Sequence, residues 1–423
     1  MSSLEPLGLG LDLGTSGLRL VVVDQQQQPL HEQALEYPGP FRDPHSWRQG
    51  FITLAAAIPE DLKCKVAAIA IDGTSGTLVA CTRRGVPLGD ALAYCDAISE
   101  KTAAARNLVP DGGAAASASG SVVRALQLLE QHNWNGNPSD VPLLRHQADW
   151  LMGWLLGNWH WGEEGNNLRL GWDQEQQRWP EGIASAAWNQ ALPVISASGT
   201  RLGPLTKEAA SALGLPQTTE VVCGTTDSNA SVLAADPALG DGVAVLGTTL
   251  VLKQFHSRPL HGPGISNHRL DGRWLVGGAS NTGAGVLRQF FSDTQLVELS
   301  RQIDPQRPSG LQLRPLTCRG ERFPIDDPQL EPGLGPRPIS DALYLQALLE
   351  GLCAVEREGW KRLQELGAPP LQRVLSVGGG ARNPQWSQLR RQALELQVLD
   401  RSRTSAATAM ARLALRGATS NSS

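Results

Sequence analysis

The feature that most constrains this chain is a strand, a glycine-rich turn and a second strand within residues 7–24. Residues 7–13 alternate leucine with glycine or aspartate, and this period of two predicts a strand. The turn that follows, Gly-Thr-Ser-Gly at 14–17, offers backbone N–H groups and hydroxyls that can bind a phosphate. Asp12 would repel that phosphate unless a cation lies between them, so it indicates Mg²⁺ or a substrate hydroxyl. The alternative is a plain hairpin with a solvated aspartate.

Composition narrows the class of protein. The 423 residues favour two or three domains, and 41% hydrophobic with 18% charged residues is typical of a globular chain. A net charge of -4 without a basic block argues against nucleic-acid binding. The six cysteines are scattered and form no CxxC pair, which argues against a zinc cluster and fits reduced thiols in the cytoplasm. The chain shows no secretory signal, and no apolar run approaches the ~18 residues that a membrane span needs.

Further turns follow other expected strands. The runs 242–246 and 250–254 flank Gly-Thr-Thr at 247–249, a weak echo of the first turn that suggests two related domains unless it is coincidence. A third glycine turn at 378–380 follows the strand 373–377. We also expect a polar turn at 72–77 after a buried strand, a hairpin from 78–82 and 86–92, a loop at 159–171, an irregular region at 302–340 and helices at 46–58, 99–107, 122–132, 147–156, 230–235, 341–366 and 385–394.

Common catalytic motifs are absent. No lysine follows a glycine, which excludes a Walker A loop. Leu13 stands where a Rossmann motif beginning at Gly8 would need its third glycine, and no GxSxG elbow is present. What remains is a nucleotide held by backbone turns from two domains.

Five short motifs follow one another along the chain. They are Gly-Leu-Asp-Leu-Gly-Thr-Ser at 10–16, Gly-Pro-Leu-Thr-Lys-Glu-Ala-Ala at 203–210, Val-Cys-Gly-Thr-Thr-Asp at 222–227, Gly-Glu-Arg-Phe-Pro at 320–324, and Gly-Gly-Gly-Ala-Arg-Asn-Pro-Gln-Trp at 378–386. Each motif is weak alone, but with all five in this order the chain resembles the FGGY family of carbohydrate kinases over nearly its full length.

The resemblance implies an α/β fold, with two RNase H-like domains of the actin-like ATPase type shared by sugar kinases, Hsp70 and actin, and a cleft between them. It implies an N-terminal sugar-binding domain at 1–232 and an ATP-binding domain at 233–404. A C-terminal helix at 405–418 could pack back on the first domain.

The resemblance also implies roles for single residues. Asp227 would be the general base that takes the proton of the sugar hydroxyl, and the alternative is an N-cap carboxylate. Asp12 would hold Mg²⁺, directly or through water, and touch the sugar, while Ser75 would bind sugar hydroxyls unless it is only a turn hydroxyl. The ATP-binding residues would be Gly14, Thr15 and Ser16 at the transferred phosphate, Gly247, Thr248 and Thr249 at the other phosphates, and Gly379, Gly380, Asn383 and Trp386 around the adenosine.

The substrate is inferred from departures within the family. Where many members have Trp before an Asp, this chain has Tyr94-Cys95-Asp96, and where xylulose kinases have Met-His it has Thr77-Leu78. The compact chain is similar to xylulokinase-like proteins of photosynthetic organisms, which favours ATP-dependent phosphorylation of a pentulose, first D-ribulose.

Other hypotheses stay open at this stage. They are a D-xylulose kinase, an actin- or Hsp70-like ATPase acting on protein partners, and a degenerate kinase that turns over slowly. We expect a cytoplasmic monomer or homodimer that binds ATP, Mg²⁺ and a small sugar, with no nucleic acid or membrane as partner.

Overall fold

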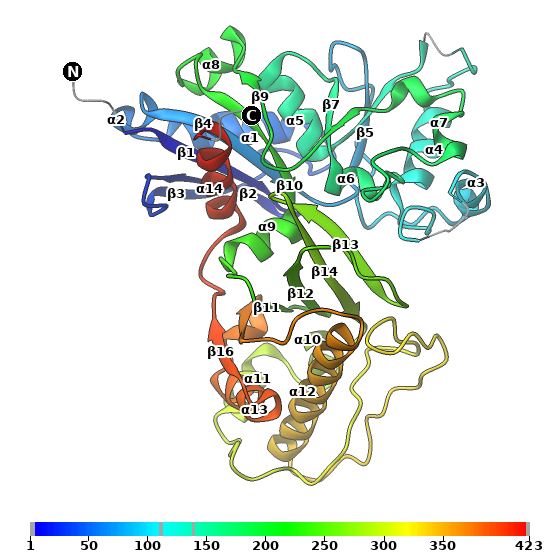
Figure 1. Cartoon of the computed structure of the whole chain (residues 1–423), viewed down its shortest axis with the longest axis vertical. Coiled ribbons are helices and arrows are strands. Elements are labelled where there is room, and N and C mark those ends of the chain that lie inside the picture. The colour runs from blue at the N-terminus through cyan, green and yellow to red at the C-terminus, as the bar shows by residue number, and fades with distance from the viewer. Residues whose placement is uncertain (1–4, 110–112, 138–139, 420–423) are drawn as a thin grey trace. The chain divides into compact units, whose positions relative to one another are not determined.

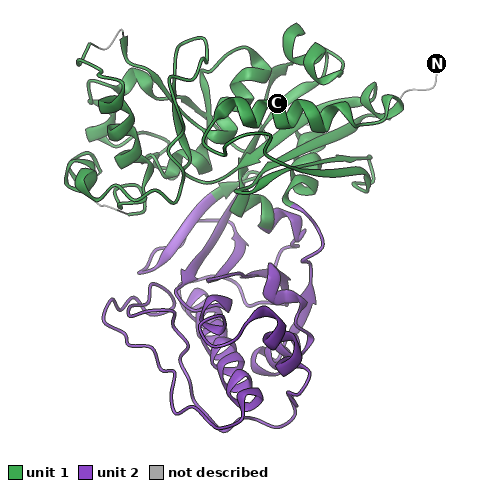
Figure 2. Ribbon diagram, turned by 180° about the vertical axis from the view of Figure 1, so that it is seen from behind, with its two compact units in different colours: residues 1–231, 269–272, 406–423 green, residues 232–268, 273–405 purple. Residues whose placement is uncertain are grey.

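The computed structural model describes residues 5–109, 113–137 and 140–419. The chain forms two compact units, drawn in two colours in Figure 2. The first unit comprises residues 1–231, 269–272 and 406–423, and the second comprises 232–268 and 273–405. Figure 1 labels most elements of both units.

The first unit is built on a six-stranded mixed sheet. Its strands lie in the order β3-β2-β1-β4-β10-β9, in which β1 is antiparallel to β2 and parallel to β4. The alternating leucines of β1 are all buried, as a strand with one apolar set requires. The strands are β1 (Leu7–Leu13), β2 (Gly17–Val23), β3 (Pro29–Glu36), β4 (Val66–Gly73), β9 (Arg201–Pro204) and β10 (Glu220–Thr226).

Helices and short strands surround this sheet. They are α1 (Pro44–Ala56), α2 (Glu60–Lys63), β5 (Leu78–Cys81), η1 (Ser99–Lys101), α3 (Thr102–Leu108), α4 (Ser121–Gln131), β6 (Leu143–His146), α5 (Gln147–Leu156), β7 (Trp161–Glu163), α6 (Glu164–Leu168), α7 (Glu181–Ala184), η3 (Asn189–Ala191), β8 (Val194–Ser196), α8 (Lys207–Leu213), α9 (Asp227–Ala234) and α14 (Ala406–Thr419).

The last helix, α14, lies on β1 because two glycines leave room for it. A Cβ on Gly8 would lie 2.2 Å from the carbonyl oxygen of Ala411, and one on Gly10 only 2.0 Å from that of Ala407. Real side chains cannot approach so closely, so the glycines between the leucines of β1 form the floor on which the helix rests. The N-terminal turn of α14 therefore lies toward the end of β1 that carries Asp12.

Five strands of the second unit repeat the order and directions of five strands of the first, β3-β2-β1-β4-β10. Its sheet has the order β13-β14-β12-β11-β15-β16, in which β11 is antiparallel to β12 and parallel to β15. The turns after β1 and β11 thus follow equivalent strands. Its elements are β11 (Asp241–Leu246), β12 (Leu250–His256), β13 (Ile265–Leu270), β14 (Arg273–Ser280), α10 (Ala284–Leu287), α11 (Asp293–Ser300), α12 (Asp341–Glu365), β15 (Arg373–Val377), η4 (Gly379–Arg382), α13 (Pro384–Leu394) and β16 (Gln397–Asp400).

The hairpin expected from 78–82 and 86–92 forms: Thr82 N donates to Val86 O at 2.9 Å, Leu88 N to Ala80 O at 3.0 Å, and Leu92 N to Leu78 O at 2.9 Å, while β5 also pairs with β6. One local expectation was wrong. The loop expected at 159–171 contains β7 and α6. None of the described helices is both long and apolar enough to cross a bilayer.

Candidate active site

Two carboxylates lie side by side where β1 and β4 end. Asp12 and Asp72 are register partners in these parallel strands, so their side chains leave the same face of the sheet about 5 Å apart. Asp72 is fully buried, and apart from the contact between its carboxyl group and that of Asp12, neither of its carboxyl oxygens has a hydrogen-bond partner among the described residues. Burial, followed by the charge of Asp12, raises the pKa of Asp72 well above its usual range. Burial also raises the pKa of Asp12, while a hydrogen bond with the Asp72 carboxyl group and the charge of Arg19 lower it.

Asp227 stands at the end of β10, as the first residue of α9. Its Oδ1 accepts from the backbone N–H of Ser228 at 2.7 Å. Burial raises the pKa of Asp227 to about 6; the N–H groups of Ser228 and Ser75 oppose this shift, and the charge of Asp12 adds to it. The N-cap hydrogen bond belongs to the preceding residue, because Thr226 Oγ1 accepts from Asn229 N at 3.3 Å. A half-buried carboxylate that titrates near neutrality and does not cap its helix is suited to proton transfer.

The turn after β4 brings Ser75 to this carboxylate. Its two threonines are committed to internal bonds: Thr74 donates from N to Gln147 Oε1 at 3.0 Å, and the hydroxyls of Thr74 and Thr77 are 2.7 Å apart. No hydrogen bond of the Ser75 hydroxyl is found within the described ranges. The Ser75 hydroxyl is therefore available to a ligand, with its own backbone N–H facing Asp227.

The turn after β1 is held in place by hydrogen bonds to its backbone, and its tip is exposed. The Tyr37 hydroxyl donates to the Gly14 carbonyl at 2.8 Å, and Gly14 N donates to Gly17 O at 3.0 Å. Thr15 and Ser16 are exposed, with Thr15 Oγ1 3.3 Å from the Tyr94 hydroxyl. Two exposed hydroxyls on a braced turn are the arrangement that a phosphate-binding loop needs.

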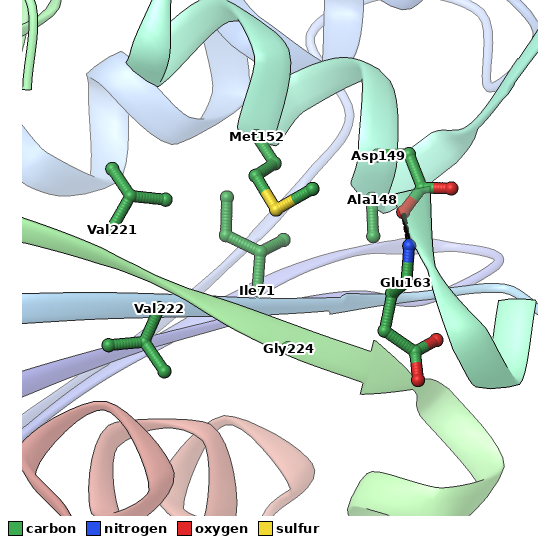
Figure 3. A pocket seen from close by; sticks show the side chains of 8 residues that line it. All are labelled: Ile71, Ala148, Asp149, Met152, Glu163, Val221, Val222 and Gly224. Carbon is green, nitrogen blue, oxygen red and sulfur yellow. Dashed lines mark hydrogen bonds between the residues drawn. The ribbon is translucent and has the colours of Figure 1, made fainter. Parts of the chain in front are cut away.

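A second pair of acids, Asp149 and Glu163, lines a small cavity beside β10 (Figure 3). The side chain of Asp149 accepts from the backbone N–H of Glu163 at 2.9 Å, drawn there as a dashed line. The cavity volume is about 10 Å³, room for one water molecule and not for a sugar. Burial raises the pKa of Glu163 to about 8, while its carboxyl group caps α6 by accepting from Gly165 N at 2.7 Å. Asp149 and Glu163 thus support the fold around the candidate active site and do not line that site.

In the second unit the expected phosphate turn is also braced. Gly247 O accepts from Ala284 N at 2.9 Å and Thr248 O from Gly285 N at 3.0 Å. A Cβ on Gly283 would lie 2.5 Å from Thr248 O, so this contact requires glycine. Thr248 itself is exposed and Thr249 is half-buried. The backbone of this turn is thus fixed while Thr248 is exposed.

The expected adenosine residues differ in how open they are. A Cβ on Gly379 would meet nothing within 4 Å, whereas one on Gly380 would lie 2.4 Å from the Trp386 ring. The Trp386 side chain is 3% exposed and belongs to the hydrophobic core of the unit. Asn383 Oδ1 caps α13 by accepting from Trp386 N at 3.1 Å. Gly379 therefore offers open backbone, and Asn383 and Trp386 also shape the fold.

A divalent cation would fit the strand ends of the first unit. The described residues contain no group of three or more His, Cys, Asp or Glu side chains that could hold a metal by themselves. Mg²⁺, however, usually takes one or two carboxylates and completes its shell with water and substrate phosphates. Asp12, with the unpartnered oxygens of Asp72 beside it, provides such a pair.

Comparison with known proteins fits this layout. The model for the FGGY family of carbohydrate kinases, N-terminal domain, matches residues 7–234, and the model for the C-terminal domain of that family matches residues 242–418. The chain therefore belongs to the FGGY family of carbohydrate kinases, which use ATP to phosphorylate sugars.

Relatives support the fold over the whole chain. A xylulose kinase of Lactococcus lactis is 23% identical, over 90% of this chain and 81% of its own. A solved structure described as a xyloylose kinase from Brucella ovis superposes with a TM-score of 0.83 at 23% identity, covering 98% of this chain and 91% of that one. Plasmodium falciparum glycerol kinase with ADP gives a TM-score of 0.81 at 16% identity, covering 99% and 91%. The fold is the two-domain actin-like ATPase fold of these kinases.

Proposed function

We propose that this protein phosphorylates a pentulose, with D-ribulose as the first candidate and D-ribulose 5-phosphate as the product. The observation that carries the proposal is Asp227, whose pKa of about 6 leaves the carboxylate charged and basic at neutral pH. It lies beside the free hydroxyl of Ser75, where a sugar could be bound with its reacting hydroxyl toward Asp227. Asp227 would align and deprotonate that hydroxyl for attack on the γ-phosphoryl group of ATP.

The other groups would handle charge and position. Phosphoryl transfer depends mainly on alignment and on stabilising the charge of the transferring group. The backbone N–H groups and hydroxyls of Gly14, Thr15 and Ser16 would contact that group. Those of Gly247, Thr248 and Thr249 would hold the remaining phosphates. Gly379 and Gly380 would let the adenosine approach the backbone, with Asn383 and Trp386 shaping that pocket.

Mg²⁺ would supply positive charge against the phosphates at Asp12, with Asp72 as its neighbour. The role of the protein here is to present oxygen ligands at a fixed strand end. Asp12 would also accept from a sugar hydroxyl.

D-Xylulose is the second candidate, since relatives with full-length similarity are named xylulose kinases. Against it stands the turn after β4, where Thr77 occupies the Met-His region of those kinases. The Thr77 hydroxyl is buried and accepts from Tyr94 N at 3.1 Å, so it faces inward and not toward a sugar.

A panel of pentuloses tests the proposal. ADP release would be measured with D-ribulose, L-ribulose, D-xylulose and L-xylulose, with glycerol and L-fuculose as non-pentulose controls. We expect the highest kcat/KM with D-ribulose. A higher value with D-xylulose would reassign the substrate, and ATP turnover that no sugar stimulates would refute the kinase proposal.

A further inference from the structure

Helix α6 joins the two parts of the candidate sugar site. At its N-terminal end, a Cβ on Gly165 would lie 3.2 Å from Nδ2 of Asn229, two residues after Asp227. At its C-terminal end, Arg169 Nε lies 3.7 Å from the position of a Cβ on Gly76, next to Ser75. A short helix thus spans from the proposed base to the sugar-binding turn, all within the first unit.

Arg169 has a polar atom that the fold does not use. Its guanidinium group donates one hydrogen bond, from Nη2 to Ser119 O at 2.7 Å, while Nε is buried and has no partner among the described residues. Among the described residues, Arg169 forms no ion pair with a carboxylate. Burial alone lowers the pKa of its guanidinium group. An N–H group buried without a partner is costly, which makes a missing ligand the natural explanation.

The neighbouring arginine does not share this property. Arg124 is fully buried and donates to five backbone carbonyls, those of Gly76, Ala93, Tyr94, Asp96 and Ser119. It therefore fixes the loops around the sugar-binding turn. The free donor beside that turn is Arg169 Nε.

Asn166 offers a complementary atom on the same side of α6. Residues three apart in a helix share a face, so Asn166 lies one turn before Arg169. Asn166 is fully buried; its Nδ2 donates to Glu163 Oε2 at 3.0 Å, and its Oδ1 has no partner among the residues described. Glu163 thereby fixes the amide so that its acceptor end is left free.

We propose that Arg169 Nε and Asn166 Oδ1 form a sugar-specificity pair, in which Arg169 donates to an acceptor oxygen of the sugar and Asn166 accepts from an adjacent hydroxyl. A donor-only atom and an acceptor-only atom three residues apart at α6 match a keto oxygen next to a hydroxyl. The ligand class is thus an open-chain ketose in preference to the corresponding alditol. This inference rests on the proposed sugar kinase function and names the residues that select its substrate.

The test compares sugar binding and turnover in wild type and in Arg169→Lys, which keeps the charge but removes the Nε–H. The loss of one charge-assisted hydrogen bond predicts a rise of about 10–100-fold in the Kd and KM for the pentulose. The KM for ATP and the melting temperature should stay near wild type. Arg106→Lys, at an exposed arginine of α3, is the matched control. Calorimetric titration of the sugar without ATP reports binding independently of catalysis.

Asn166→Ala provides a second measurement. It also removes the contact with Glu163, so its melting temperature must be read together with its sugar affinity. Kd values for pentulose within threefold of wild type in both variants would overturn the pair, as would an equal loss of affinity for ketose and alditol. Wild type that binds no pentulose would instead refute the proposed function itself, and the pair with it.

Discussion

The two units end their equivalent strands in opposite ways. In the first unit, Asp12 and Asp72 are register partners one residue before the ends of β1 and β4. Neither carboxyl group forms an ion pair among the described residues, because Arg19, the cross-strand neighbour of Asp12, pairs with Glu32. At the corresponding place in the second unit, β11 and β15 carry the register partners Val245 and Val377. Charge that the fold leaves uncompensated is expected where a cation or a reaction will use it. We therefore propose that the first unit supplies the chemistry and that the second supplies backbone groups for binding.

The buried charges of the second unit support the same contrast. Arg390 and Glu356 are both buried and form a two-pronged ion pair, with Nε–Oε2 at 2.6 Å and Nη2–Oε1 at 2.7 Å. Arg390 Nη1 also donates to Ser376 Oγ at 2.5 Å. Each charge has its partner, so this cluster joins α12, α13 and β15 and needs no ligand. The comparison predicts that removing charge costs activity in the first unit and stability in the second.

The largest effect is expected at the proposed base. Asp227→Asn should lower sugar-dependent kcat by about 10²–10⁴-fold, the usual contribution of a general base. The melting temperature should not fall, because the variant removes a carboxylate whose charge burial disfavours. A coupled ADP-release assay with a thermal melt checks both, and a variant that retains a tenth or more of wild-type kcat would contradict the assignment.

The same group predicts a pH profile. With a pKa of about 6, Asp227 is charged above that value and protonated below it. The kcat/KM for the sugar should be level above pH 6 and fall about tenfold per unit below it. The sign for stability is opposite: the folded state holds this proton more tightly than the unfolded chain, so the contribution of Asp227 to stability declines as pH rises toward 6. A kcat/KM that is flat between pH 5 and 7 would argue against Asp227 as the base.

Breaking the buried pair of the second unit tests the other half of the contrast. Glu356→Ala leaves Arg390 buried and unpaired, which should cost about 3–5 kcal/mol of unfolding free energy. Replacing both residues, with Glu356→Leu and Arg390→Met, should cost less than the single change. Urea unfolding monitors the loss. If the single change costs under about 1 kcal/mol, the pair contributes little to this unit.

A packing change in the first unit should have an intermediate effect on stability. Gly10→Ala places a methyl group 2.0 Å from the Ala407 carbonyl, so α14 must shift, at a cost of about 1–3 kcal/mol. Gly39→Ala is the control, since its Cβ would lie 3.5 Å from the nearest atom, Ser46 Oγ. Equal melting temperatures for the two variants would show that α14 does not depend on this contact.

The smallest effect is expected from removing one tyrosine hydroxyl in each unit. Tyr37→Phe removes the bond to the Gly14 carbonyl, and Tyr344→Phe removes a bond of the same length, 2.8 Å, to the Leu334 carbonyl. Each should cost about 1 kcal/mol of stability. Only Tyr37→Phe should also raise the KM for ATP, by a few-fold, because it loosens the turn after β1. An equal rise in the KM for ATP in Tyr344→Phe would show that the effect is not specific to the turn after β1.

Local patterns in the sequence predicted the elements that depend on local order. The helix expected at 341–366 is α12, Asp341–Glu365, and the strand expected at 373–377 is β15. Both follow from long runs with one clear period. Helix α6 was missed because five residues rich in glycine and asparagine carry no helical period. Its start is set by Glu163, and a Glu followed by Gly165 and Asn166 with free N–H groups was the available signal.

Local sequence patterns also predicted only part of the candidate site. Asp12 stood out in the sequence because it ends an obvious strand, whereas Asp72 was only the first residue of a polar turn. Its importance arises from the register of β4 against β1, a pairing across some sixty residues that no local pattern specifies. Comparing the last two residues of each buried strand would have brought the two acids together. Arg169 could not be found in this way, because its free Nε is defined only by the packing around it.

The seating of α14 on β1 has a consequence for biosynthesis. The face of β1 that this helix covers contains Gly8 and Gly10, and its cover, from Ala406 onward, is made long after it. During translation the first unit must therefore wait with an uncovered apolar surface until α14 has left the ribosome, a state prone to aggregation. A nascent chain stalled before residue 406 should be a chaperone client, even though all of its proposed catalytic and binding residues have already been made.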